Sequence, residues 1–228
     1  MGTILITGAN RGLGLEFTQQ FAAAGHRILA CCRNPDQAHE LQELAAGGAI
    51  TVAALDVADF SQIEALARRW AGETIDVLIN NAGVYGKRTG LGDLDYEEWA
   101  QVFKINVQAP MKMAELFRQA VARGERKVIV NISSKMGSIS DNSSGGAYVY
   151  RSSKAALNAL TKSLAVDLAP LGILVVALHP GWVRTRMGGA GGLIDAQESV
   201  AGMKKIIDGL SPRQSGGFFN YDGREIPW

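Results

Sequence analysis

The chain has 228 residues, enough for one sizeable core and short for two, so we expect a single domain over residues 1–228. Hydrophobic residues make up 47% of the chain and charged residues 20%, as in an ordinary globular protein. The net charge is +1, so the chain lacks the excess of basic residues that is typical of a nonspecific nucleic-acid binder. The two cysteines, Cys31 and Cys32, are adjacent and form no disulfide framework, and no apolar run is long enough to span a bilayer, so we expect a cytoplasmic protein without a membrane partner.

Short apolar runs alternate with longer segments of helical periodicity along the whole chain. In chain order, the expected strands are Thr3–Thr7, Arg27–Cys32, Ala49–Leu55, Val77–Asn80, Lys127–Ile132, Leu174–His179 and Gly217–Asn220. The expected helices are Gly12–Ala24, Asp36–Ala45, Ser61–Ala71, Tyr96–Arg123, Tyr150–Asp167 and Ala196–Leu210. Several strands are continuously apolar, which is typical of strands buried on both faces. This alternation predicts an α/β fold of the Rossmann type, a doubly wound parallel seven-stranded sheet with helices on both faces.

A glycine-rich segment, Thr7 to Gly14, follows the first expected strand and opens the first expected helix. Glycines let the backbone turn tightly and approach a pyrophosphate, and the helix N-terminus offers free N–H groups to it. We therefore interpret the segment as a dinucleotide site, and its expected cofactor-binding residues are Gly8, Asn10, Arg11, Gly12, Leu13 and Gly14. The alternative is an ordinary tight turn between a strand and a helix.

The end of the second strand indicates which dinucleotide binds. NAD-binding proteins usually place an acidic residue there for the ribose hydroxyls, and this chain has Cys32 instead. Arg33 and Asn34 follow, and Arg11 lies in the glycine loop, so two guanidinium groups are available for a 2′-phosphate. These residues favour NADP (NADPH) over NAD, against the alternative of two solvated surface arginines.

Two later strand ends carry weaker cofactor signals. Asp56 and Val57 close the third strand and are interpreted as contacts of the adenine edge, although a strand-end Asp also commonly caps the next turn. Asn81, Ala82 and Gly83 close the fourth strand, where small residues let a cofactor cross the strand ends. A simple Asn/Gly turn is the alternative for this second segment.

Tyr150 and Lys154 lie one helical turn apart and share a helix face. A phenol has a pKa of about 10, and a nearby ammonium group favours the phenolate and lowers that pKa. Tyr148 is the competing tyrosine, but its partner four residues on is the uncharged Ser152. At the end of the fifth strand, Ser134 is a hydroxyl able to polarise a substrate carbonyl, with Ser133 as the alternative.

In this order and spacing, these motifs resemble the short-chain dehydrogenase/reductase family over nearly the whole chain. The matching motifs are Thr7-Gly8-x-x-x-Gly12-x-Gly14, Asn80-Asn81-Ala82-Gly83, Asn106, Ser134, Tyr150-x-x-x-Lys154 and Pro180-Gly181. Within the family, the sequence is most similar to sniffer-type or C-factor-like carbonyl reductases through Tyr148–Asp167, Leu178–Val183 and the tail Gly216–Gly223.

The resemblance implies an NADP-dependent oxidoreductase that reduces a ketone, aldehyde or quinone carbonyl, or oxidises the alcohol in reverse. It implies that Tyr150 protonates the nascent alkoxide and that Lys154 lowers the pKa of Tyr150 and binds the nicotinamide ribose. Ser134 orients the carbonyl, and Asn106 holds a water that links Lys154 to solvent. The nicotinamide end is expected against Pro180, Gly181, Val183 and Thr185.

Four further residues follow strand ends and are interpreted as the lining of a substrate pocket beside Ser134, namely Val84, Tyr85, Met136 and Trp182. For Trp182 the alternative is packing in the core. No metal is expected, because the only histidines, His26, His39 and His179, are scattered along the chain.

The expected partner is a small-molecule carbonyl or alcohol. A homo-oligomer is also expected, either a dimer through the segments Tyr96–Arg123 and Tyr150–Asp167 or a tetramer. The rival interpretation from another functional class is an NADP-binding signalling or redox-sensing protein with little turnover. A related dehydratase or epimerase is disfavoured, because 228 residues leave no room for its larger C-terminal substrate region.

Overall fold

The computed structural model describes residues 1–228 and contains one parallel sheet of seven strands in the order β3-β2-β1-β4-β5-β6-β7. The strands are β1 Thr3–Thr7, β2 Arg27–Cys32, β3 Ile50–Ala54, β4 Val77–Asn80, β5 Val128–Ile132, β6 Leu174–His179 and β7 Phe218–Asn220. Neighbouring strands pair in parallel throughout. The predicted doubly wound fold is therefore confirmed, with the order of strands reversing between β1 and β4.

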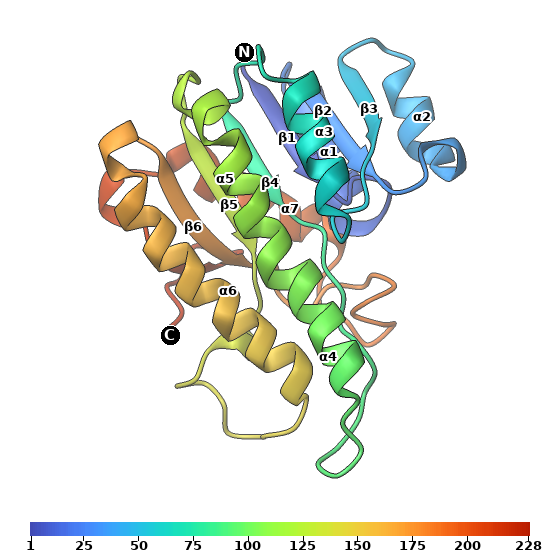
Figure 1. The fold of residues 1–228 in the computed structure, drawn as a ribbon, viewed down its shortest axis with the longest axis vertical. Coiled ribbons are helices and arrows are strands. Elements are labelled where there is room, and N and C mark those ends of the chain that lie inside the picture. The colour runs from blue at the N-terminus through green and yellow to red at the C-terminus, as the bar shows by residue number, and fades with distance from the viewer.

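Helices cover both faces of the sheet (Figure 1). One face packs against α1 Gly12–Ala23, α2 His39–Ala45 and α7 Ala196–Gly209. The other packs against α3 Phe60–Arg69, α5 Ala109–Ala122 and α6 Tyr148–Asp167, while α4 Tyr96–Phe103 continues the line of α5 beyond the sheet (Figure 1). Right-handed crossovers between parallel strands produce this two-sided covering.

The strands are apolar on both sides because each sheet face has its own core. Leu5 of β1 and Ile129 of β5 belong to the core beneath α3, α5 and α6, whereas Ile4 and Ile6 belong to the core beneath α1, α2 and α7. Fully buried aromatic rings fill both cores, Phe117 on one side and Phe17 on the other. Burying one such side chain contributes on the order of 1.5–3 kcal/mol of transfer free energy, so the two cores hold the helices on the sheet.

The expected helix Tyr96–Arg123 is helical throughout but is not a single α-helix. Residues Lys104–Gln108 form a π-helical turn between α4 and α5, and Asn106 lies in it. A π turn contains one residue more than an α turn and is frequent at functional sites. The extra residue turns the Asn106 side chain inward, where both its amide groups bind the backbone of Val84.

Two other expected helices have different starts in the structure. The segment expected as Asp36–Ala45 begins with a 3-10 turn, Pro35–Gln37, and α2 starts only at His39, because Ala38 leaves the helical backbone region. Helix α6 starts at Tyr148, two residues before the expected Tyr150, after Ala147 in the left-handed region with a φ of 46°. Tyr150 is therefore in the first turn of α6. None of the helices combines the length and the apolarity that crossing a bilayer requires.

Candidate active site

The turn between β1 and α1 forms a backbone cradle at the carboxyl edge of the sheet. Gly8 and Gly12 have positive φ values of 68° and 52°, which glycine adopts without strain. Gly14 is buried, and a side chain there would collide with the Gly8 carbonyl oxygen. Arg11 precedes α1 and makes no side-chain cap, so the first N–H groups of the helix remain available to an anion. The cradle fits a pyrophosphate group.

The carboxyl end of β4 braces this cradle. Thr7 Oγ1 accepts hydrogen bonds from the N–H groups of Asn81 and Ala82, both at 3.1 Å. Asn81 Nδ2 donates to the carbonyl oxygens of Thr7 at 2.9 Å and Gly8 at 3.2 Å. The two strand ends nearest the topological switch point are thus tied together by side chains. Thr7 is a site residue that the sequence interpretation treated only as part of the glycine motif.

At the end of β2, the positions expected to contact the adenosine end lie close to the cradle. Cys32 is buried, while Arg33, Asn34 and Arg11 are exposed. Neither Arg11 nor Arg33 takes part in any of the ion pairs of the structure. Two free guanidinium groups and no carboxylate at the end of β2 suit a 2′-phosphate rather than two free ribose hydroxyls.

After β3, the structure supports the turn alternative for Asp56. Its Oδ1 accepts a hydrogen bond from the Ala58 N–H at 2.9 Å, so this oxygen stabilises the turn that precedes α3. The Val57 side chain is buried in the core beneath α3, which leaves only its backbone for an adenine ring. Asp56 and Val57 therefore lie at the expected edge of the sheet, but their side chains can make fewer contacts with an adenine ring than the sequence suggests.

The segment after β6 closes the crevice from the other side. Thr185 lies against the glycine loop, because its Cγ2 is 3.6 Å from the position a Cβ on Gly12 would take. Gly181 has a φ of 83°, and Pro180 accepts a hydrogen bond from Ser199 Oγ of α7 at 2.5 Å. The structure thus brings Thr185 next to the phosphate cradle, while the other expected nicotinamide-side residues, Pro180, Gly181 and Val183, follow the carboxyl end of β6.

Tyr150 points from the first turn of α6 into a buried position beside the end of β5. Burial raises the pKa of Tyr150 to about 12, and a hydrogen bond with Ser134 acts in the opposite direction. The expected lowering of this pKa by Lys154 stays a prediction, and burial is the largest influence on the phenol in the chain alone. Ser133 faces elsewhere, since its hydroxyl donates to Asn158 Oδ1 at 2.6 Å. Ser134 is therefore the serine that meets Tyr150.

Lys154 is buried one turn further along α6, with its Nζ 5.7 Å from the centre of the Tyr150 ring. Its ammonium group donates to the Ile132 carbonyl oxygen at 2.8 Å, and burial lowers its pKa to about 8. A Cβ on Gly83 would be 3.6 Å from this Nζ and 3.3 Å from Asn106 Oδ1. The lysine and Asn106 therefore meet at Gly83, where only a glycine leaves the space free.

Asn106 is held by three hydrogen bonds. Its Oδ1 accepts from the Val84 N–H at 2.9 Å, and its Nδ2 donates to the Val84 carbonyl at 2.8 Å and to Ser153 Oγ at 3.0 Å. Ser153 Oγ donates in turn to the Tyr150 carbonyl at 2.8 Å. The sequence interpretation missed Ser153, although its place between the tyrosine and the lysine was the available signal.

A buried polar ladder holds α6 in register on β5 below the site. Lys154 binds the Ile132 carbonyl, Asn158 binds the Ser133 hydroxyl, and Thr161 Oγ1 accepts from Asn131 Nδ2 at 2.9 Å. The three helix residues recur at the spacing of one α-helix face. Buried hydrogen bonds are costly to leave unmade, so sliding the helix along the strand is disfavoured. The ladder therefore fixes the distance between Tyr150 and Lys154 on α6 and Ser134 at the end of β5.

Three of the four candidate pocket residues contact the site, since Val84 binds Asn106, Tyr85 stacks on Tyr150 and the Met136 N–H donates to Ser134 Oγ. Val84, Tyr85 and Met136 are half-buried. Trp182 is 54% exposed and its Nε1 donates to the Gly188 carbonyl at 2.8 Å, so the alternative of a core tryptophan is wrong. Nowhere do three His, Cys, Asp or Glu side chains come together in a group able to hold a metal ion.

The fold and site together define an α/β oxidoreductase built to bind a dinucleotide at the switch point of its sheet. Comparison with known families gives a match between residues 2–191 and the short chain dehydrogenase model. The chain belongs to the short-chain dehydrogenase family.

Individual relatives refine this assignment. C-signal of Myxococcus xanthus is 47% identical over 154 residues, which cover 68% of this chain and 93% of that protein. The structure of carbonyl reductase Sniffer of D. melanogaster superposes with a TM-score of 0.96 at 37% identity, covering 100% of both chains. That of the NADPH-bound carbonyl reductase from chicken fatty liver gives 0.94 at 36% identity, covering 100% of this chain and 99% of the other. The predicted closeness to sniffer-type and C-factor-like proteins is confirmed.

Proposed function

We propose that this protein is an NADPH-dependent carbonyl reductase that reduces ketones, aldehydes or quinones and catalyses the reverse oxidation of the alcohols. NADP is its cofactor, as expected for an oxidoreductase similar to NADP-bound carbonyl reductases. The observation that carries the proposal is the meeting of Ser134, Tyr150, Lys154 and Asn106 at the carboxyl edge of β4 and β5. A protein that only binds a dinucleotide does not require these four groups.

The cofactor would lie across the strand ends. Gly8 to Gly14 would hold its pyrophosphate, Arg11 and Arg33 its 2′-phosphate, and Asn81 to Gly83 together with the segment after β6 would flank its nicotinamide half. Bound there, NADPH supplies the hydride for the carbonyl carbon. Asp56 and Val57 would line the adenine pocket. Asp56 would do so through its free carboxylate oxygen and Val57 through its backbone.

Tyr150 is the proton donor in this proposal. Burial raises the pKa of its phenol, so the phenol is protonated at neutral pH and holds the proton that the carbonyl oxygen receives. Bringing this pKa nearer to the working pH is the task that the proposal gives to Lys154. The Ser134 hydroxyl reaches the same point and can hydrogen-bond that oxygen and then the phenolate. Lys154, whose pKa of about 8 leaves most of it charged at neutral pH, stabilises the phenolate electrostatically. Ser153 and the β5 ladder hold these groups in place.

The direct test mixes the protein with NADPH and a panel of aldehydes, ketones and quinones and follows the absorbance of the reduced cofactor. We expect turnover of at least one carbonyl class. The similarity to C-signal favours a second candidate, an NADP-binding signalling or sensing protein. Tight NADPH binding without turnover of any carbonyl would support that candidate and contradict the reductase.

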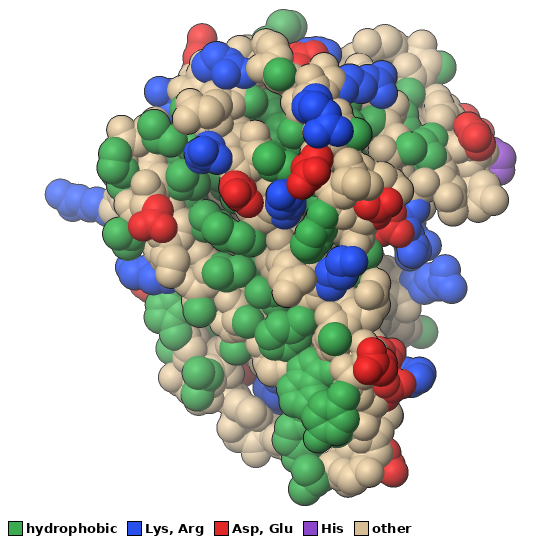
Figure 2. All heavy atoms as spheres, viewed as in Figure 1, with side chains coloured by type: hydrophobic (Ala, Val, Ile, Leu, Met, Phe, Trp, Pro, Cys, Tyr) green, Lys and Arg blue, Asp and Glu red, His purple; other side chains and the backbone are tan.

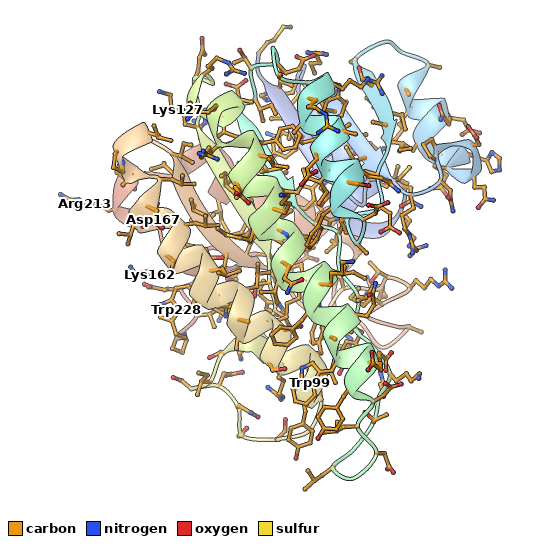
Figure 3. All side chains as sticks on the ribbon, viewed as in Figure 1. Trp99, Lys127, Lys162, Asp167, Arg213 and Trp228 are labelled. Atoms are coloured by element: carbon orange, nitrogen blue, oxygen red, sulfur yellow. The ribbon has the colours of Figure 1, made fainter.

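Arg33→Ala is expected to weaken NADPH binding by roughly ten- to a hundredfold, because a charge-assisted hydrogen bond to a phosphate contributes about 1.5–3 kcal/mol. The affinity for NADH, which lacks the 2′-phosphate, should change little. Isothermal titration with both cofactors measures the difference. Arg213→Ala, at an exposed arginine on the far side of the molecule (Figure 3), is the matched control and should change neither affinity. Equal losses for both cofactors in Arg33→Ala would contradict the phosphate contact.

The proposal includes a homo-oligomer, either a dimer through α4, α5 and α6 or a tetramer. Hydrophobic side chains gather on the face shown in Figure 2, and α5 and α6 each carry an exposed hydrophobic residue, Met111 and Val166. It also includes a cytoplasmic location, with which the two free, buried cysteines agree.

A further inference from the structure

The segment between β4 and α4 carries an aromatic side chain that the reaction has not yet used. It leaves β4 at Asn80 and runs alongside α4 before turning back into that helix (Figure 1). Within it, the Tyr85 ring stacks on the Tyr150 ring, with centroids 4.4 Å apart and planes inclined by 23°. The Arg88 guanidinium lies 5.3 Å from the centre of the Tyr85 ring. A stack therefore runs from the surface to the reactive phenol.

The backbone on both sides of Tyr85 is anchored. On one side, both polar groups of the Val84 backbone bind the Asn106 amide. On the other, the Lys87 N–H donates to Glu98 Oε1 at 2.9 Å, and Lys87 Nζ pairs with Asp95 at 3.0 Å. The segment is thus fastened to α4 and the π turn at two points that bracket Tyr85.

The residue after Tyr85 shows how closely the segment packs. Gly86 has a φ of 79°, and a Cβ there would lie 3.1 Å from Val102 Cγ2 and 3.6 Å from Val149 Cγ1. Val102 belongs to α4 and Val149 to α6, directly before Tyr150. The backbone directly after Tyr85 is therefore packed closely between α4 and α6.

We propose that Tyr85 is a positioning residue for Tyr150, whose ring fixes the phenol in its reactive orientation and shields one face of it from water. This rests on the proposed function, in which Tyr150 is the proton donor. An offset aromatic pair contributes about 0.5–1.5 kcal/mol beyond the area it buries. Because a misplacement of about 1 Å at a reacting group can cost a hundredfold in rate, holding the phenol matters more for kcat than for stability.

The electrostatic surroundings of Tyr150 allow the shielding to be measured. The ionisable groups facing it are Lys154 on its own helix and Tyr85 on the β4–α4 segment, and Ser134 at the end of β5 contributes a neutral hydroxyl. Burial is the largest cause of the raised pKa of Tyr150, and the charge of an ionised Tyr85 adds to it. To measure the effect of the ring alone, both variants that are compared must therefore lack the Tyr85 hydroxyl.

The variants are Tyr85→Phe, which keeps the ring without the hydroxyl, and Tyr85→Leu, which removes the ring. Tyr85→Met is a second ring-free variant in case the leucine variant does not fold. Tyr96→Leu is the matched control, because Tyr96 also stacks on an aromatic ring, that of Trp99, at a 71% exposed position outside the site. Thermal unfolding of each variant reports any general loss of structure.

The first measurement needs no turnover. Ultraviolet difference absorbance follows tyrosinate formation in each variant with and without Tyr150→Phe, which isolates the titration of Tyr150. We expect Tyr150 to ionise at a pH lower by at least about half a unit in Tyr85→Leu than in Tyr85→Phe, because water reaches the uncovered face of the phenol.

The second measurement is the kinetics with saturating NADPH and the best substrate of the panel. We expect Tyr85→Leu to lower kcat by about tenfold or more relative to Tyr85→Phe, with NADPH affinity unchanged. The alkaline limb of the pH profile, set by loss of the phenol proton, should move to lower pH in the same variant. Tyr85→Phe, the conservative variant, should recover most of the kcat that Tyr85→Leu loses, and Tyr96→Leu should keep nearly the wild-type kcat.

The outcomes separate this inference from the proposed function. Equal Tyr150 titration and equal kcat in Tyr85→Leu and Tyr85→Phe would overturn it, as would a rise in KM alone, which marks a simple pocket wall. A Tyr85→Phe variant as impaired as Tyr85→Leu would also overturn it. If the wild type reduces no carbonyl but the Tyr150 titration still shifts, the proposed function fails and the contact between the two rings stands.

Discussion

Replacing Tyr150 by phenylalanine is expected to lower kcat for carbonyl reduction on the order of a thousandfold, within the range that a general acid contributes. The ring remains, so it can still stack on Tyr85, and the buried volume is nearly unchanged. Only the proton and the hydrogen bond with Ser134 are lost. NADPH affinity should therefore stay close to that of the wild type, which fluorescence titration of the cofactor measures alongside the steady-state rate.

Tyr148→Phe is the control for this substitution. Tyr148 lies two residues earlier on α6, is 37% exposed and has the uncharged Ser152 one turn further on. The structure gives it no contact with Ser134 or Lys154, so its loss should leave kcat unchanged. Retention of more than about a tenth of the wild-type kcat by Tyr150→Phe would contradict its role, because a general acid contributes at least a hundredfold.

Much of this arrangement could be predicted from the sequence because it depends on local patterns. Continuous apolar runs such as that of β5 indicate strands buried on both faces, and a glycine loop after the first strand marks the switch-point end of the sheet. The carboxyl ends of parallel strands share one edge, so the residues that follow β1, β4, β5 and β6 are brought together by topology alone.

The remaining features depend on contacts between segments far apart in the chain. The π turn at Asn106 occurs together with hydrogen bonds from its amide to Val84, 22 residues earlier, which no local periodicity indicates. The choice between Ser133 and Ser134 depends on the direction of Asn158 on α6. Likewise, the stacking of Tyr85 on Tyr150 joins the β4–α4 segment to α6. Spacing cannot encode these orientations.

The pKa of Tyr150 shows the same division between local and global causes. The sequence places an ammonium group one turn away, which favours a lowered pKa. It gives no measure of how deeply the phenol is buried, and burial decides the sign. For Lys154, burial acts in the opposite direction and lowers the pKa, because desolvation always penalises the charged form. The two shifts therefore move the pKa values of the pair apart, from 10.0 and 10.5 to about 12 for Tyr150 and about 8 for Lys154.

Lys154→Met should lower kcat on the order of a hundredfold or more, because it removes the positive charge that stabilises the phenolate while keeping an unbranched side chain of similar length. The same variant tests the electrostatics of the folded chain without any substrate. The ordinary lysine pKa of 10.5 applies to the unfolded chain, against about 8 in the folded one. Between these values the unfolded chain binds more protons, so the wild-type free energy of unfolding should rise with pH.

The rise from Lys154 is on the order of 3 kcal/mol across its whole window, or about 1.4 kcal/mol per pH unit. The raised pKa values of Cys31 and Cys32 act in the opposite sense from about pH 9, and that of Tyr150 does so above pH 10, so the clean comparison lies between pH 8 and pH 9. Urea unfolding over that range should show this increase in the wild type and lack it in Lys154→Met. Lys162→Met, at an exposed lysine two turns further along α6 (Figure 3), should behave like the wild type. If Lys154→Met shows the same pH dependence as the wild type, Lys154 is not the buried ammonium group on which the proposed stabilisation of the phenolate depends.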